Sequence, residues 1–239
     1  MSLSIIIPTY NESKNIKHLI NKINEELKIK KIIVVDDSPQ NNIAREIKYF
    51  KNVDYIYRGK KLGRGSAVIE GLKYSLKNYE SKIFIEMDAD LSHDPVELKK
   101  NIKLFTEANS DLLISSRYLK NSIIENWTYR RKIFSFFANK LAKLLLEVPV
   151  TDYTNGYRIY SYAAANHICK HCGKIGDGFI TLSEILVELY YNNYKIIETY
   201  SKFVNRIRGE SSVNFLEIIN SLIGLYKIYN LKKKIKQKF

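Results

Sequence analysis

Short, continuously apolar runs alternate in the first half of the chain with segments whose apolar residues recur every three or four positions. The apolar runs are SIIIP (4–8), KIIVVDD (31–37), VDYIYR (53–58), KIFIEMDAD (82–90) and DLLISSRY (111–118). Helical patterns lie between them, at residues 16–27, 64–78 and 95–108. Apolar strands joined by helical crossovers predict an α/β fold, with a mostly parallel central sheet and helices on both faces.

The second half of the chain is more helical in pattern. Residues 127–147 predict a long helix that is basic at its start and apolar later, residues 195–200 a strand, and residues 215–231 a helix that runs into KKKIKQK. We therefore expect one α/β domain over residues 1–213 and an amphipathic basic helix over residues 214–239. This helix either lies on an anionic membrane surface or packs on the sheet.

Polar residues follow several of the predicted strands at the same end. In open α/β sheets, ligands bind beyond the carboxyl ends of the strands. The residues found there are Pro8, Tyr10, Glu12, Asp36, Asp37, Asp88, Asp90 and Arg117. Acids, an aromatic ring and an arginine therefore meet on one rim, which predicts a ligand site.

The sharpest chemical signal is MDADLSHDP, residues 87–95. If the extended backbone continued, Asp88 and Asp90 would point to the same side, and two like charges so close favour a cation between them. Mg²⁺ or Mn²⁺ held by two carboxylates and substrate phosphates fits this pattern, and a solvated acidic turn is the alternative. For His93, a role in hydrogen bonds within the loop is favoured over a role as a metal ligand or a base. The glycine-rich KKLGRGSAVIEG, residues 60–71, allows close backbone approach to phosphates but equally suits a plain turn.

The chain carries a net charge of +14 over 239 residues, with a pI near 9.5. An anionic partner is therefore expected: a nucleotide, nucleic acid or an acidic membrane surface. Nucleic acid is the least favoured, because carboxylates gather on the very rim where phosphates would bind and no nucleic-acid-binding signature appears. The first residues resemble no signal peptide and no apolar run approaches the roughly 20 residues of a membrane span, so we expect a cytoplasmic, peripheral protein. Cys169 and Cys172 lack a second pair for zinc and are expected at a helix end or in a loop.

Eight segments stand in the order and near the spacing of one family. They are IIPTYNE, VVDDSP, KKLGRGSAVIEG, MDADLSHDP, SRY, WTYRRKIFSFFAN, DYTNGYRIY and FVNRIRGESS. Over residues 3–215 the chain resembles the dolichyl-phosphate mannosyltransferases, inverting nucleotide-sugar glycosyltransferases of the GT-A fold. The first and fourth segments mark the broad class, whereas SRY, the arginine-rich segment and DYTNGYRIY point to the polyprenyl-phosphate branch.

The resemblance implies a role for each matching residue. The base and ribose of the nucleotide would be held by Pro8, Tyr10, Glu12, Val35 and Asp37. The metal and donor diphosphate would be held by Asp88, the backbone of Ala89, and Asp90. The acceptor phosphate would be gripped by Arg117, Arg131 and Ser135, while Arg206 would lie on a loop that closes over the donor. Asp152 is read as a positioning residue for Arg158 or the sugar, and Trp127 as either a lipid-groove or an ordinary core residue.

The implied reaction is metal-dependent transfer of mannose from GDP-mannose to dolichyl or another polyprenyl phosphate, with inversion, by a catalytic domain over residues 1–213. An anionic phosphate acceptor needs no strong general base, so catalysis would rest on alignment and charge stabilisation. UDP-glucose or UDP-N-acetylglucosamine as donor, a non-lipid acceptor and a membrane-anchoring subunit are left open. Three departures from the family pattern make the prediction of the sugar less specific. They are Ser212, where the family usually has lysine, Ser92, where many relatives have an amide, and VVDDSPQNN, which lacks the usual Asp-Gly-Thr after its proline.

Overall fold

A seven-stranded sheet forms the centre of the protein, with the strand order β3-β2-β1-β4-β7-β5-β8. The computed structural model describes residues 2–27, 31–205 and 215–237, and in residues 215–219 the backbone only. The sheet strands are β1 (Leu3–Thr9), β2 (Lys31–Asp36), β3 (Val53–Tyr57), β4 (Ile83–Glu86), β5 (Leu112–Ser116), β7 (Arg158–Ser161) and β8 (Ile196–Tyr200). All neighbouring strands pair in parallel except β7, which is antiparallel to both β4 and β5. The predicted mostly parallel sheet is therefore confirmed.

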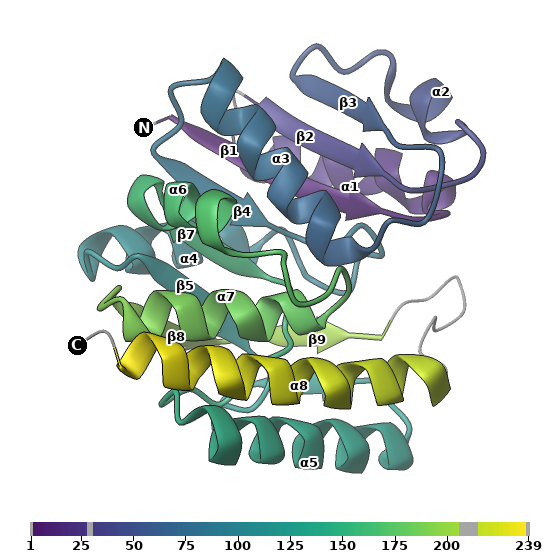
Figure 1. Cartoon of the computed structure of the whole chain (residues 1–239). Coiled ribbons are helices and arrows are strands. Elements are labelled where there is room, and N and C mark those ends of the chain that lie inside the picture. Colours follow the sequence, from purple (N-terminus) through teal and green to yellow (C-terminus); the bar gives the residue numbers. More distant parts are fainter. Residues whose placement is uncertain (1, 28–30, 206–214, 238–239) are drawn as a thin grey trace.

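Helices cover both faces of this sheet (Figure 1). One core holds α1 (Ser13–Glu26), α2 (Ile43–Ile47) and α4 (Glu97–Glu107) against the sheet, and the other holds α3 (Arg64–Asn78), α5 (Tyr129–Leu146), α6 (Tyr162–His171), α7 (Ile180–Tyr191) and α8 (Phe215–Lys236). Successive strand residues alternate between the cores: Ile5 and Ile7 face the first, and Ile6 faces the second. The strands are continuously apolar because both of their faces are buried.

Strand β7 and the helices α6 and α7 were not predicted from the sequence pattern. β7 spans only four residues and is antiparallel, so it fits neither the rhythm nor the direction of the strand–helix alternation. A separate pair of short strands, β6 (Ile123–Glu125) and β9 (Lys202–Val204), lies beside the sheet. An isolated bridge between His93 and Phe203 connects β9 to the loop after β4.

The C-terminal helix α8 packs on α7 and α5, whereas packing on the sheet itself was the expected alternative to a membrane surface (Figure 1). Leu225, Ile228 and Ile235 are buried in the core, and the Nζ atom of Lys232 lies 2.8 Å from the carbonyl oxygen of Leu145. None of the described helices combines the length and the apolar character needed to cross a bilayer.

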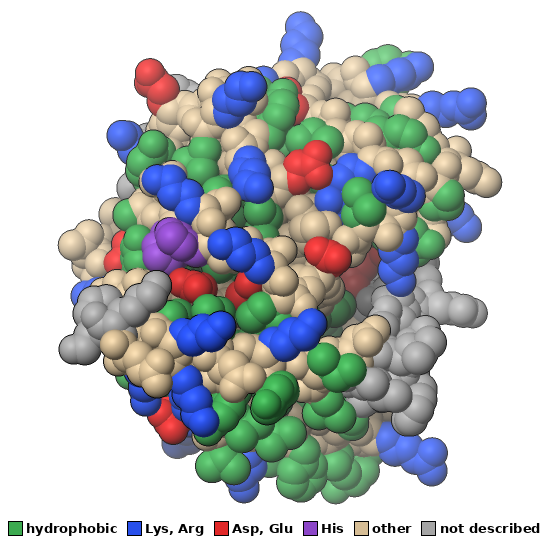
Figure 2. Space-filling model, in the orientation of Figure 1, with side chains coloured by type: hydrophobic (Ala, Val, Ile, Leu, Met, Phe, Trp, Pro, Cys, Tyr) green, Lys and Arg blue, Asp and Glu red, His purple; other side chains and the backbone are tan. Residues whose placement is uncertain are grey.

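The outer side of α5 remains apolar and exposed. Hydrophobic side chains gather along the lower edge of Figure 2, where Figure 1 places α5. The exposed apolar residues of this helix are Tyr129, Ile133, Phe134, Phe136, Phe137, Leu141 and Leu144. We call this set the α5 face.

Candidate active site

The loops after β1 and β2 form the first part of the rim. Asp36, at the end of β2, is fully buried and accepts hydrogen bonds from Thr9, Ser38 and Tyr55. Of the residues expected to hold a base and ribose, Tyr10 is 40 % exposed, and the Nζ atom of Lys61 lies 5.3 Å from its ring centroid. The rim therefore keeps one accessible aromatic face next to a cation.

The other predicted nucleotide residues are less accessible. Pro8 and Val35 are buried in the sheet, and Val35 packs beneath α3. Glu12 is half-buried and accepts a hydrogen bond from Asn15 at 2.6 Å. Val35 is 0 % exposed, so none of its atoms is accessible to a nucleotide in this structure.

Asp37 organises the glycine-rich loop. Its carboxylate accepts the backbone N–H groups of Leu62 and Gly63, each at 2.8 Å, and pairs with Arg58 at 2.5 Å. Gly63, with φ of +97°, turns the chain into α3. The sequence left a plain turn and a phosphate loop equally open, and the structure adds that an acid of the rim fixes this turn.

The acids of the DAD segment follow β4, but the strand ends at Glu86. Residues 89–90 form a turn, and Leu91 has a φ of +63°. The condition for the extended-backbone argument is therefore not met. The geometry of the Asp88–Asp90 corner is set by this turn, in which the Oδ1 atom of Asp90 accepts the backbone N–H of Ser92 at 3.1 Å.

Asp88 lies between two cationic or ionisable groups. The guanidinium of Arg64 is 2.7 Å from Asp88 Oδ1, and His93 Nε2 is 3.5 Å from Asp88 Oδ2. Burial raises the pKa of Asp88, but Arg64, with His93, more than offsets this and holds that pKa well below its usual range. Asp88 is consequently a carboxylate throughout the physiological pH range.

His93 does not form the loop hydrogen bonds that were expected of it. It is fully buried between the rings of Tyr157 and Phe203, with centroid distances of 5.3 and 5.2 Å. Neither ring nitrogen has a hydrogen-bond partner among the described residues. His93 is held by ring packing, by its backbone bridge to Phe203 and by the approach of its Nε2 atom to Asp88 in the same loop.

The oxygen atoms of this corner fit a hard divalent cation. Asp88 and Asp90 supply carboxylates, and the buried hydroxyl of Ser92 has no hydrogen-bond partner in the described part of the chain. Within those same residues, no group of three or more His, Cys, Asp or Glu side chains is placed to hold a metal. Carboxylate and hydroxyl oxygens are ligands that Mg²⁺ accepts, and Mg²⁺ commonly leaves its remaining positions to water and substrate phosphates.

Arg117 follows β5 and is fixed by Asp152. Its Nε and Nη2 atoms donate to the Asp152 carboxylate at 2.7 and 2.8 Å, and both side chains are almost fully buried. Of the two roles expected of Asp152, the positioning of Arg158 is wrong, and the positioning of the sugar stays a prediction. Arg158 lies on β7 and instead donates to the carbonyl oxygens of Tyr153, Asn155 and Leu182.

The inner stripe of α5 carries the other two acceptor-phosphate candidates. Arg131 and Ser135 are one helical turn apart and therefore share a face. Arg131 donates to Asn205 at 2.9 Å, and the hydroxyl of Tyr118, which follows Arg117, lies 2.6 Å from Ser135 Oγ. Helix α5 thus turns a polar stripe toward the rim and the apolar α5 face outward.

Trp127 brings these groups together, a role that neither of its two sequence interpretations included. The guanidinium carbons of Arg117 and Arg131 lie 5.4 and 4.2 Å from its ring, and Phe203 packs against it edge to face. Its indole Nε1 is buried without a hydrogen-bond partner among the described residues. The two predicted phosphate-binding arginines therefore share one aromatic ring, and Phe203 links that ring to His93 and the Asp88 corner.

Comparison with known proteins shows the family of this chain. The family model described as Glycosyl transferase family 2 matches residues 4–169. The chain belongs to glycosyl transferase family 2.

Two similar relatives carry names from the branch that the motifs indicated. The "Dolichol-phosphate mannosyltransferase" of Pyrococcus furiosus is 32 % identical over 98 % of this chain and 66 % of its own length. The "Polyprenol monophosphomannose synthase" of Mycolicibacterium smegmatis is 31 % identical over 88 % of this chain and 80 % of its own length. The resemblance stated from the motifs is confirmed, and this chain spans about two thirds of the length of the first relative.

Solved structures confirm the GT-A fold. Glucosyl-3-phosphoglycerate synthase from Mycobacterium tuberculosis, in a complex with Mn²⁺, uridine diphosphate and glucosyl-3-phosphoglycerate, has a TM-score of 0.68. It shares 15 % sequence identity, and the match covers 96 % of this chain and 80 % of that chain.

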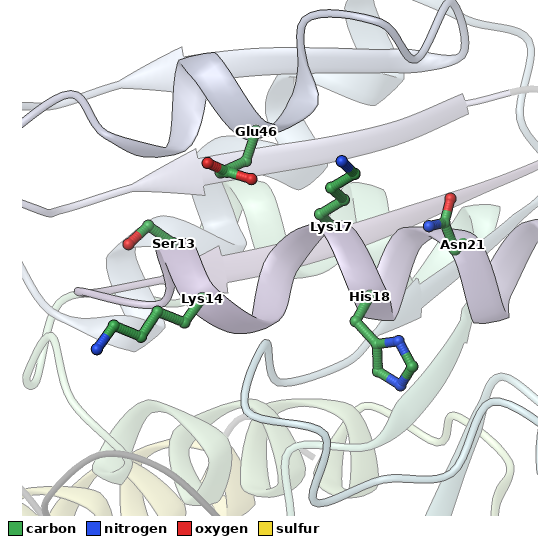
Figure 3. A pocket seen from close by; sticks show the side chains of 6 residues that line it. All are labelled: Ser13, Lys14, Lys17, His18, Asn21 and Glu46. Carbon is green, nitrogen blue, oxygen red and sulfur yellow. The ribbon is translucent and has the colours of Figure 1, made fainter.

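Two hollows lie along α1, one of them beside Asp90, and most of their lining residues were not singled out from the sequence. A cavity of about 390 Å³ beside Asp90 is lined by Lys14, Asn15, His18, Asp90, Leu91, Val204 and Asn205. A more open one of about 530 Å³ is lined by Ser13, Lys14, Lys17, His18, Asn21 and Glu46. Figure 3 shows Lys14 and His18 on the side of α1 opposite Glu46. The available signal was their position on the exposed face of the helix that follows PTYNE.

Arg206 lies outside the described residues, as do Arg208 and Ser212. The expected roles of these residues over the donor stay predictions.

Proposed function

We propose that this chain is a polyprenyl-phosphate mannosyltransferase that moves mannose from GDP-mannose to dolichyl phosphate or a related polyprenyl phosphate, with inversion. The observation that carries the proposal is the cluster of Arg117, Arg131, Ser135 and the Trp127 N–H, which has no partner among the described residues, one ring away from the Asp88 corner. Two guanidinium groups and a buried donor suit a phosphate monoester. The names of the two relatives support the same substrate class.

The donor diphosphate would lie at the Asp88–Asp90 corner. Asp88, Asp90 and the backbone of Ala89 would hold Mg²⁺ or Mn²⁺, and a metal bound there supplies Lewis-acid stabilisation of the leaving nucleoside diphosphate. Mn²⁺ accompanies the nucleotide in the solved synthase complex, which supports a divalent ion at the matching place in this fold. Tyr10 would offer its exposed face to the base.

The acceptor phosphate would attack from the arginine cluster. An oxygen of the phosphate is already anionic, so it needs no general base, and a single in-line displacement inverts the anomeric carbon. Asp152 fixes Arg117, and the Trp127 ring lies 5.4 Å from the Arg117 guanidinium and 4.2 Å from that of Arg131, so the arginine cluster is organised before the acceptor arrives. Such preorganisation lowers the cost of aligning the reactants.

A direct assay tests this function. Purified protein is mixed with Mn²⁺, dolichyl phosphate and GDP-[¹⁴C]mannose, with UDP-glucose and UDP-N-acetylglucosamine as parallel donors, and radioactivity is measured in the organic phase. Labelled lipid from GDP-mannose alone is the expected result. Transfer only from a uridine nucleotide would reassign the sugar, and no product from any donor would contradict the proposal.

Replacing Arg131 with alanine is expected to raise the KM for dolichyl phosphate by about 10- to 100-fold, with the KM for the donor unchanged. The lost interaction is a charge-assisted hydrogen bond to the acceptor. Initial-rate kinetics with each substrate varied in turn provide the measurement. Arg130→Ala is the matched control, because Arg130 is the neighbouring exposed residue on α5. An unchanged acceptor KM in Arg131→Ala would favour a non-lipid acceptor.

We further propose that the α5 face rests on the cytoplasmic surface of a membrane, so that the acceptor phosphate reaches the arginine cluster on the inner stripe of the same helix. The support is the position of both sets on one helix: apolar residues outside, and Arg131 and Ser135 inside. Exposed Lys132, Lys140 and Lys143 on α5 would add attraction to anionic lipids. The same face suits a membrane-anchoring subunit.

The double replacement Phe136→Ser/Phe137→Ser is expected to weaken binding to vesicles by about 10-fold or more. The reason is that binding no longer transfers two half-exposed aromatic rings from water into the membrane. Sedimentation with vesicles of phosphatidylcholine and phosphatidylserine measures the effect. Tyr49→Ser is the control, since Tyr49 is 78 % exposed after α2, on the opposite side of the sheet. Equal loss in both variants, or no loss in the double variant, would argue against the α5 face as the contact.

A further inference from the structure

The guanidinium of Arg64, the first residue of α3, places a fixed positive charge at the Asp88 corner. It binds Glu86 at 2.5 Å and Asp88 at 2.7 Å, and its Nη2 atom donates to the Gly156 carbonyl oxygen at 3.3 Å. The ring of Phe179 covers it, with a centroid distance of 5.4 Å. One guanidinium therefore joins the glycine-rich loop, β4 and the DYTNGYR segment.

The surroundings of Arg64 are too specific for an incidental surface pair. Glu86 is fully buried and accepts a second hydrogen bond, from the Tyr160 hydroxyl, at 2.6 Å. A Cβ atom added at Gly156 would lie 1.9 Å from Arg64 Nη2, so the absence of a side chain there gives the guanidinium its place. A buried cation held between two carboxylates and a carbonyl oxygen is oriented as well as neutralised.

We propose that Arg64 makes divalent-metal binding at Asp88 conditional on the donor diphosphate, an inference that rests on the proposed function. Arg64 already neutralises the carboxylate that a metal would use, and an added dication would meet its positive charge across the same group. The Arg64 guanidinium and a dication on the same carboxylate would repel each other strongly, because the interior of a protein screens charges less than water does. A diphosphate adds negative charge beside both cations and removes the conflict, so the metal and nucleotide bind together.

This coupling has a reciprocal consequence. If nucleotide raises the affinity for metal by some factor, metal raises the affinity for nucleotide by the same factor. The enzyme would then hold little metal between turnovers and would assemble the charged donor site only when the nucleotide sugar is present. Arg64 acts through Asp88 in this scheme and is a positioning residue.

The test measures Mn²⁺ binding rather than turnover. Free Mn²⁺ is followed by its electron paramagnetic resonance signal during titration of the protein, first alone and then with saturating GDP. Arg64→Gln is expected to tighten Mn²⁺ binding without GDP by about 10-fold and to reduce the gain that GDP brings by a similar factor. Arg64→Lys keeps the charge and is expected to retain most of the coupling.

A second variant protects the test against misfolding. Arg64→Gln alone leaves Glu86 buried without its cation, so Arg64→Gln/Glu86→Gln removes both members of that pair, which proteins tolerate better than removal of one. Gly156→Ala displaces the guanidinium while keeping the arginine, and the same direction of change is expected. Mn²⁺ affinity and GDP coupling that stay at wild-type values in these variants would overturn the inference alone. Wild-type protein that binds no Mn²⁺ even with GDP would overturn the proposed function as well.

Discussion

Replacement of Asp88 with asparagine is expected to lower the kcat of mannosyl transfer by about 10³-fold while the protein remains folded. Asparagine keeps the size of the side chain but removes the charge that would hold a divalent ion against the leaving diphosphate. The loss concerns stabilisation of charge that develops in the transition state, so kcat falls more than the acceptor KM rises.

The measurement is the initial rate of lipid-linked mannose formation, with far-ultraviolet circular dichroism to verify the fold. Asp94→Asn is the matched control, because Asp94 lies in the same loop and its Oδ1 accepts the Val96 N–H, a bond that the asparagine oxygen can also accept. Asp94→Asn is expected to change the rate by less than about threefold. Similar rates for Asp88→Asn and wild type would remove Asp88 from the proposed metal site.

Replacement of Asp152 with alanine is expected to lower the free energy of unfolding by about 3–5 kcal/mol. The change leaves the buried Arg117 guanidinium without its counter-charge and also removes the acceptor for the backbone N–H groups of Thr154 and Asn155. Because Arg117 then loses its fixed position in the acceptor cluster, the acceptor KM is expected to rise as well. Urea unfolding followed by circular dichroism gives the first quantity and steady-state kinetics the second.

The pH dependence of stability tests the same pair. Burial raises the pKa of Asp152, but Arg117 and the hydrogen bonds lower that pKa by more than burial raises it. The folded-state pKa therefore lies below the unfolded value of about 3.9. The contribution of the pair is therefore present above about pH 4 and is lost as the pH falls through the folded-state pKa. Below pH 4 we expect wild type to lose stability more steeply than Asp152→Ala.

A surface pair serves as the control for this prediction. Lys103 and Glu107 are 3.8 Å apart on α4, with side chains 74 % and 64 % exposed. Solvent screens such a pair, so Glu107→Gln is expected to cost less than about 0.5 kcal/mol. A comparable loss in both variants would mean that burial of the Arg117–Asp152 pair contributes little.

The sequence by itself determined the parallel strands of the sheet and the rim. Continuously apolar strands such as 32–35 can be satisfied only where both faces are covered, and crossover helices make neighbouring strands parallel. Once the strands are parallel, residues that follow them must meet at one edge, which is why Asp37, Asp88 and Arg117 could be assigned to one rim. The inner stripe of α5 was also implicit, because Arg131 and Ser135 are four residues apart.

Only the tertiary structure decided which charges neutralise one another. Asp152 pairs with Arg117 and not with Arg158, although the sequence allowed the second pair. The reason is that β7 enters the sheet antiparallel between β4 and β5 and turns Arg158 into the interior. Arg64 contacts Asp88 because α3 packs on β1, the strand next to β4, and α8 packs on α7 because α7 covers its buried apolar residues. Periodicity reports which face of an element is buried, whereas these pairings join positions 24 and 35 residues apart in the chain, and they depend on the order of the strands and the space between them.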